Sequence, residues 1–247
     1  MSKVDLFLTL PVMNAAGSLG FAPEPEGPVD LDRLGAFVTN PVSMQRRSPS
    51  RDRHYAPFPG GFLLHTGNPN PGFREVIRRY QARWKHSPLP VIVNLLAEHP
   101  ETLASMVTQL EGIEGVIGVE VNLPPAVDSQ TAVDLAQAAA GELPVIVRLP
   151  MERALELAEA LAGSGVAALS LGPARGTLPD PQGSPRRGRL YGQALFPQAL
   201  HMVSLLAQGL LPVIGAGGVY GQAEVEAMLE AGAIAVQLDA VLWRGGW

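Results

Sequence analysis

Polar side chains stand at or near the ends of five successive apolar, strand-like runs in this sequence. In chain order they are Asn14, Asn40, Asn94, Asn122 and Arg148. If the runs are parallel strands of one barrel, their ends meet on the face where such barrels hold active sites. Four amides around one cation suit a planar ligand with carbonyl groups and ring nitrogens. Each asparagine could instead satisfy loop backbone at its strand end, so both interpretations stay open.

A glycine-rich turn, Gly215-Ala-Gly217-Gly218, forms a second candidate site before a helical pattern over Gly221–Gly232. Glycine lets backbone N–H groups approach an anion, and a helix N-terminus adds a positive dipole. The loops after the last two strands of an eight-stranded barrel commonly hold phosphate. Asp239 would repel a phosphate if it faced this site. The alternatives are a plain tight turn and an Asp239 that is buried and paired elsewhere.

The segment Arg33–His86 carries ten lysine or arginine residues against Asp52 and Glu75. Such a patch is typical of an anion-attracting lid, of a surface for an acidic partner, or simply of solvated loop and helix faces. His65 in this segment and Asp128 farther along are loop residues that could act as acid or base. The five histidines show no HxH or HExxH spacing, so the sequence predicts no metal site.

The elements that must position these residues are eight strand-like runs that alternate with amphipathic helical patterns. Repeated strand–helix alternation predicts a parallel sheet, and eight repeats in 247 residues predict a closed (β/α)8 TIM barrel. An open doubly wound sheet is the alternative. The predicted strands are Leu8–Asn14, Leu34–Asn40, Pro90–Leu96, Val116–Leu123, Pro144–Leu149, Ala167–Gly172, Leu211–Val219 and Ala233–Leu242. The predicted helices are Phe73–Trp84, Pro100–Glu111, Thr131–Ala140, Glu152–Ala162, Pro197–Gln208 and Glu224–Ala231.

Two long segments, 41–72 and 173–192, break this alternation and are rich in Pro, Gly and Arg. We predict structureless loops over the C-terminal face of the barrel, because long loops in compact domains are usually lids or binding loops. The sequence continues for five residues after the eighth predicted strand, so we expect the C-terminal closing helix of a standard barrel to be missing or supplied by something else. The absence of a linker predicts a single domain over residues 1–247.

Composition excludes several classes of protein. Hydrophobic residues make up 47% and charged residues 17%, which indicates a folded chain. The net charge of −5 argues against nucleic acid as a partner. The absence of cysteine rules out disulfides, iron–sulfur clusters and cysteine catalysis. No apolar run approaches the length of a membrane span, and we expect a cytoplasmic protein.

An ordered set of motifs makes this sequence resemble the dihydroorotate dehydrogenase family, whose members are FMN-dependent (β/α)8 barrels. Each motif is weak alone, but together they cover nearly the whole chain in family order. The motifs are Pro11-Val-Met-Asn14-Ala-Ala-Gly17-Ser-Leu-Gly20, Gly35-Ala-Phe-Val-Thr39, Asn70-Pro-Gly72-Phe73, Val93-Asn94, Val119-Glu-Val-Asn122, Pro144-Val-Ile-Val-Arg148-Leu149, Leu169-Ser-Leu171, Gly192-Gln-Ala-Leu-Phe-Pro197, Pro212-Val-Ile-Gly-Ala-Gly-Gly218 and Ala231-Gly-Ala-Ile-Ala-Val-Gln237.

The resemblance implies an oxidoreductase of the CH–CH donor type that transfers hydride through FMN. Residues early in the chain would lie along the isoalloxazine, asparagines would contact its polar edge, and Arg148 would stand beside flavin N1 and O2. Glycines late in the chain would give N–H groups to the phosphate. The implied cofactor-binding residues are Ala15, Ala16, Gly17, Asn40, Asn94, Asn122, Arg148, Gly192, Gly217 and Gly218. A small-molecule substrate and either a homodimer or a partner subunit are also expected.

The sequence departs from the family pattern at the residues that would do chemistry. Pro124-Pro125-Ala126-Val127 stands where the family has its Cys or Ser base, and proline cannot abstract a proton. Leu64 and Pro173 replace asparagines of the substrate site, and Asn40 replaces a lysine. Asp239-Ala240 replaces a Gly-Thr phosphate contact, which puts FMN binding in question.

Three hypotheses follow from these departures. The first is a divergent flavoprotein oxidoreductase whose substrate is not dihydroorotate. The second is a non-catalytic barrel that has lost FMN and acts as a binding or accessory subunit. The third is a different barrel enzyme that acts on a phosphorylated metabolite held by Gly217, Gly218 and the arginines.

Overall fold

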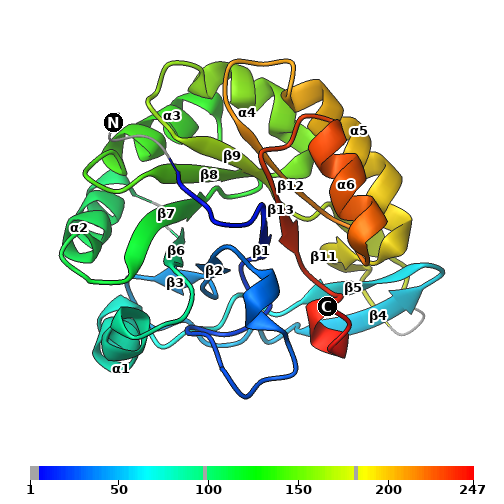
Figure 1. Cartoon of the computed structure of the whole chain (residues 1–247). Helices are drawn as coiled ribbons and strands as arrows, with labels where there is room; N and C mark the ends of the chain where they lie inside the picture. Colours follow the sequence, from blue (N-terminus) through cyan, green and yellow to red (C-terminus); the bar gives the residue numbers. More distant parts are fainter. Residues whose placement is uncertain (1–5, 97–98, 181–182) are drawn as a thin grey trace.

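The predicted barrel is confirmed by a computed structural model, which describes residues 6–96, 99–180 and 183–247. Eight parallel strands form a nearly closed barrel (Figure 1) in the order β1-β13-β12-β9-β8-β7-β6-β2. A parallel bridge between Met13 and Ala36 brings the first and last strands of this path together. The strands are β1 (Val12–Asn14), β2 (Phe37–Val38), β6 (Val91–Leu96), β7 (Val116–Asn122), β8 (Val145–Leu149), β9 (Ala168–Leu171), β12 (Val213–Ala216) and β13 (Ala235–Leu238), and the short β3 (Val42–Ser43) also pairs with β6.

Six α-helices of the described chain surround the barrel in Figure 1. Their apolar faces cover the strands; on α2, for example, Leu103, Met106 and Leu110 are completely buried. The helices are α1 (Phe73–Lys85), α2 (Pro100–Leu110), α3 (Ser129–Ala138), α4 (Ala154–Leu161), α5 (Phe196–Leu206) and α6 (Gln222–Glu230), and the 3-10 turns are η1 (Leu31–Arg33), η2 (Met151–Arg153), η3 (Gln193–Leu195) and η4 (Leu242–Arg244). After β13 the described residues form the 3-10 turn η4 and no α-helix.

The inside of the barrel changes from apolar to polar along its strands. Ile92 on β6 and Ile146 on β8 belong to an apolar cluster of the barrel interior. Residues two positions apart on a strand share a face. Asn94 and Arg148 therefore stand one layer above these isoleucines, toward the carboxyl ends of the strands. The barrel has an apolar floor and a polar upper layer, and the upper layer is where a functional site would be expected.

The two segments predicted as structureless loops form a second sheet, so that prediction was wrong. Strands β4 (His54–Phe58) and β5 (Gly61–His65) make one antiparallel hairpin, and β10 (Arg175–Leu178) and β11 (Arg186–Tyr191) make another. Strand β5 pairs with β11, which gives the order β10-β11-β5-β4. This pairing joins segments that are far apart in the sequence, so no local pattern could reveal it.

The Asn14 side chain closes the barrel by forming two hydrogen bonds that a neighbouring strand's backbone would otherwise form. Its Nδ2 donates to the Val38 carbonyl oxygen at 2.7 Å, and the Val38 N–H donates to its Oδ1 at 2.8 Å. Strands β1 and β2 are only three and two residues long, and this side chain supplies two hydrogen bonds between them. Of the two interpretations of Asn14, the structural one is therefore correct, because its side-chain amide bonds backbone groups.

Replacing Asn14 with leucine should destabilise the protein strongly. Asn14→Leu leaves the buried N–H and C=O of Val38 without partners, which costs about 2–4 kcal/mol and lowers the Tm by roughly 4–15 °C. Urea unfolding followed by circular dichroism measures the change. Gln109→Ala on the exposed side of α2 is the control and should cost under about 0.5 kcal/mol. Equal losses in the two variants would contradict the closing role of Asn14.

Candidate functional site

A completely buried carboxylate, Glu120 on β7, occupies the centre of the polar layer. Asn94 Nδ2 donates to its Oε2 at 2.6 Å, while Ser170 Oγ and Gln237 Nε2 each donate to its Oε1 at 2.7 Å. Arg148 Nη1 lies 3.8 Å from Oε2 and supplies the balancing charge. A buried charge is tolerated only when it is paired and hydrogen-bonded. Residues of four other strands provide these contacts to Glu120.

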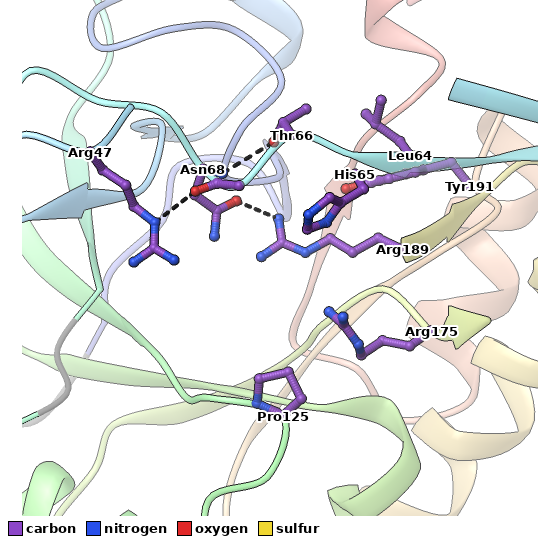
Figure 2. A pocket seen from close by; sticks show the side chains of 10 residues that line it. Arg47, Leu64, His65, Thr66, Asn68, Pro125, Arg175, Arg189 and Tyr191 are labelled. Carbon is purple, nitrogen blue, oxygen red and sulfur yellow. Dashed lines mark hydrogen bonds between the residues drawn. The ribbon is translucent and has the colours of Figure 1, made fainter. Parts of the chain in front are cut away.

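Two adjoining cavities lie beside the carboxyl end of β7, under the second sheet. Each has a volume of about 230 Å³, and both are lined by Arg47, Asn68, Pro125 and Arg189. Figure 2 shows how arginines of both loop segments surround the first of them. We call the two together the arginine cavity. The remaining lining residues are Leu64, His65, Thr66, Gly67, Arg175 and Tyr191 in the first, and Leu96, Asn122, Leu123 and Pro124 in the second.

The electrostatics of the arginine cavity favour an anion. Arg189 is half-buried, and its Nη1 donates to Asn68 Oδ1 at 3.0 Å. Burial lowers the pKa of Arg189 below its ordinary value. Within residues 6–96, 99–180 and 183–247, no carboxylate forms an ion pair with Arg175 or Arg189. Two cations that lack an acidic partner and face one cavity attract a carboxylate or a similar anion.

The structure separates the two residues predicted as candidate acids or bases. His65 lines the arginine cavity, and its Nε2 lies 3.1 Å from Ser50 Oγ. Burial, and then the charges of His54 and Arg175, lower the pKa of His65, so its neutral form is favoured. This neutral ring has a nitrogen that can accept a proton.

Asp128 has a structural role at the start of α3. It is exposed and caps the helix, because its Oδ1 accepts the Thr131 N–H at 2.8 Å. Hydrogen bonds from Thr131 lower the pKa of Asp128, whereas a general base needs a pKa near the working pH. Asp128 is not among the described residues that line the arginine cavity.

The residues predicted to hold the flavin ring are mostly covered by protein. Ala15 is 2%, Ala16 7%, Asn94 0% and Arg148 6% exposed. Arg148 Nη1 lies 3.5 Å from the Ala16 carbonyl oxygen, so these residues do come together. Of the others, the Asn40 Oδ1 accepts the Gly20 N–H at 3.2 Å, and Gly17 has a left-handed φ of 95° in the loop after β1. Among the described residues that were predicted to bind the cofactor, only Asn122 lines the arginine cavity.

The residues at the predicted phosphate end do not fit FMN. Gly217 and Gly218 are buried there, and Asp239 is only 8% exposed. A carboxyl oxygen of Asp239 accepts the Ala240 N–H, a group that would otherwise face a phosphate. Burial raises the pKa of Asp239 above its ordinary value. Because a carboxyl group takes the Ala240 N–H at this end and the residues at the ring end are covered, we derive no chemical step through FMN.

Several residues of the site were not predicted. Glu120 is the clearest omission, although a glutamate within the apolar run Val116–Asn122 is a usable signal for a buried polar centre. Arg175, Arg189 and Asn68 could not be grouped from sequence, because strand pairing across the two long segments brings them together.

Two further classes of site were searched in the described part of the chain. No group of three or more His, Cys, Asp or Glu residues is placed there to hold a metal ion. None of the described helices has the length and apolar character needed to cross a membrane.

Comparison with known proteins gives consistent matches. The family model described as dihydroorotate dehydrogenase matches residues 3–151. A relative from Trichlorobacter lovleyi is 32% identical over 255 residues, covering 95% of this chain and 84% of the relative. One from Pelobacter propionicus is 32% identical over 259 residues, covering 96% and 85%, and one from Citrifermentans bemidjiense is 31% identical over 249 residues, covering 92% and 82%. All three are named "Dihydroorotate dehydrogenase B (NAD(+)), catalytic subunit".

The raised pKa of Asp239 predicts a pH-dependent effect of Asp239→Asn. Because the folded pKa lies above the unfolded one, the native protein loses stability as pH rises through the folded pKa. The variant escapes this loss, so it should melt at a higher temperature than the native chain at about pH 8. The difference should vanish near pH 4, about the ordinary pKa of aspartate. Asp134→Asn on the exposed side of α3 is the control. A melting difference that stays constant with pH contradicts the prediction.

Proposed function

We propose, from the premise that this chain belongs to the dihydroorotate dehydrogenase family, that it binds a small planar carboxylate in the arginine cavity. The relatives are named for dihydroorotate, so dihydroorotate and its oxidised form orotate are the first ligands to test. The expectation of a different substrate gains no support from these relatives and stays a prediction.

The observation that carries this proposal is the convergence of arginines from two distant segments on one cavity. Arg47 precedes β4, whereas Arg175 and Arg189 lie on β10 and β11. The planar guanidinium group binds carboxylates through two parallel hydrogen bonds. Asn68 adds an amide beside them, suited to the carbonyl and N–H groups of a ring.

Binding without turnover is the role that the surrounding residues favour. Pro124 and Pro125 line the cavity where the family pattern has a base, and they offer only apolar ring surface. His65 can accept a proton, but it lies outside the stretch 124–127 where the family pattern has its base. We therefore favour the second hypothesis, a binding or accessory subunit. The relatives' name, a catalytic subunit of dihydroorotate dehydrogenase B, supports the first hypothesis, an oxidoreductase, and the word subunit supports a partner subunit. One domain over residues 1–247 and a cytoplasmic location belong to the same proposal.

Orotate should bind to the native chain and lose affinity when Arg189 is neutralised. Arg189→Met removes a charge-assisted hydrogen bond to the carboxylate, so the Kd for orotate should rise about 10-fold or more. Isothermal titration calorimetry measures both proteins, and melting curves confirm that the variant is folded.

Two controls sharpen this experiment. Arg187→Met removes an equal charge from the same strand at an exposed position and should leave the Kd unchanged. Uracil, which is orotate without its carboxylate, should bind the native chain far more weakly. Equal affinity for orotate and uracil, or no binding of orotate or dihydroorotate at all, would refute the proposed function.

A flavin-dependent oxidoreductase is the second candidate function. Asn94 Oδ1 and Gln237 Oε1 are buried beside Glu120 and have no hydrogen-bond partner, and a ligand ring in the barrel mouth could supply one. This function is the expectation of hydride transfer through FMN.

An absorbance spectrum of the purified protein separates the two candidates. We expect a colourless protein whose Tm does not change with excess FMN, because ligand binding would raise it. A yellow protein with flavin absorbance bands would instead establish the oxidoreductase candidate and leave the arginine cavity as its substrate site.

A further inference from the structure

The loops after the seventh and eighth barrel strands have the features of an anion site. In this barrel those strands are β12 and β13, and Gly217 and Gly218 follow β12 with left-handed φ values of 109° and 71°. A Cβ at Gly218 would lie 2.4 Å from the Phe196 backbone nitrogen, so only glycine allows this close turn. Helix α6 begins shortly afterwards. Barrels commonly bind phosphate with these loops, through backbone N–H groups.

Asp239 supplies an internal acceptor at this place. It directly follows β13, its side chain is 8% exposed, and its carboxyl oxygen accepts the Ala240 N–H. Arg148 is the nearby cation that favours its ionised form, and burial opposes ionisation. A phosphate at this position would have to displace the carboxyl group from Ala240, and it would meet charge repulsion whenever Asp239 is ionised.

Aromatic rings pack against Ala240, and two of them, Phe62 and Trp243, line a cavity of about 330 Å³ with it. Phe62 and Tyr191 are 9% and 7% exposed and form a cluster with Ala240. Their ring centroids lie 5.5 Å apart in a stacked arrangement, and Tyr191 lies 5.2 Å from Trp243. The Trp243 Nε1 donates to the Ser18 carbonyl oxygen at 3.1 Å, which ties this group to the loop after β1. We call Phe62, Tyr191 and Trp243 the aromatic cover.

The tip of the β4–β5 hairpin fastens the aromatic cover in place. The Ala194 N–H, at the loop after β11, donates to the Gly60 carbonyl oxygen at 3.2 Å. A Cβ at Gly192 would lie 2.3 Å from the same oxygen, so the two backbones are in direct contact. In Figure 1 this hairpin lies beside the C-terminal turn, as the contact between Phe62 and Trp243 requires.

We infer that the chain carries its own occupant of the phosphate end, with Asp239 and Tyr191 as the residues that exclude FMN. Asp239 accepts the Ala240 N–H, and Tyr191 packs against Ala240 beside it, so both lie where a phosphate would approach this residue. This inference concerns the loops after β12 and β13 and does not rest on carboxylate binding in the arginine cavity, so either can fail alone.

Removing the two occupants should open the site to FMN. We would titrate the native chain, Asp239→Gly, Tyr191→Ser and the double variant with FMN, following the quenching of flavin fluorescence. Far-UV circular dichroism confirms that each is folded. The native chain should bind no FMN, and the double variant should bind it at least about 10-fold more tightly than the native chain does. Asp239→Gly alone should show part of this gain, so the test survives if the double variant is unstable.

Two comparisons make the result specific. Riboflavin lacks the phosphate, so its affinity should increase much less than that of FMN in the same variants. Asp239→Asn keeps an oxygen that can accept the Ala240 N–H, so it should gain little. FMN binding by the native chain, equal gains for riboflavin and FMN, a full gain from Asp239→Asn, or no gain in folded Asp239→Gly and double variants would each overturn the inference.

Discussion

The carboxylate of Glu120 is the constraint on which the upper half of the barrel depends. A buried charge needs both an opposite charge and hydrogen-bond donors, and a single strand cannot supply them. Here Arg148 provides the charge, and Asn94, Ser170 and Gln237 donate from three further strands. Since each donor must reach one central point, the register of those strands is fixed relative to β7. The same contacts commit Asn94 and Arg148 to the protein itself, so they are less available to a ligand.

Because Asn94 and Arg148 already contact Glu120, the best candidate site lies away from the barrel axis. The polar layer inside is internally paired, and its upper end is covered by the second sheet. The arginines of that sheet differ, because the side chains of Arg175 and Arg189 form no ion pair among the described residues, although the Glu152 carboxylate accepts the Arg175 backbone N–H. Cations around a cavity give a direct reason for an anionic ligand, whereas Asn94 and Gln237 each already donate to Glu120 and keep only an amide oxygen without a partner. Function in this chain is therefore expected at the junction of barrel and sheet.

The barrel could be predicted from sequence because its pattern is local. Each strand is a short apolar run, each helix has its own periodicity, and eight repeats leave few alternatives. The site could be predicted only in part, because its residues depend on long-range pairing. Asn68 and Arg189 form a hydrogen bond although they are 121 positions apart. Asn14 shows the converse difficulty: its position at a strand end was found, but whether an amide faces a ligand or the backbone depends on the length of neighbouring strands.

The distribution of charge at the barrel mouth also distinguishes two kinds of anion. On the side of β13, Arg148 is shared by Glu120 and Asp239, and Arg244 lines the neighbouring cavities, so a phosphate there would meet the carboxyl group of Asp239 as well as a cation. On the side of β7, three arginines line the cavity together with Asn68, His65 and two prolines. A carboxylate carries less charge than a phosphate ester and needs only a guanidinium fork. We therefore expect the β7 side to suit a small carboxylate and the β13 side to disfavour a phosphate.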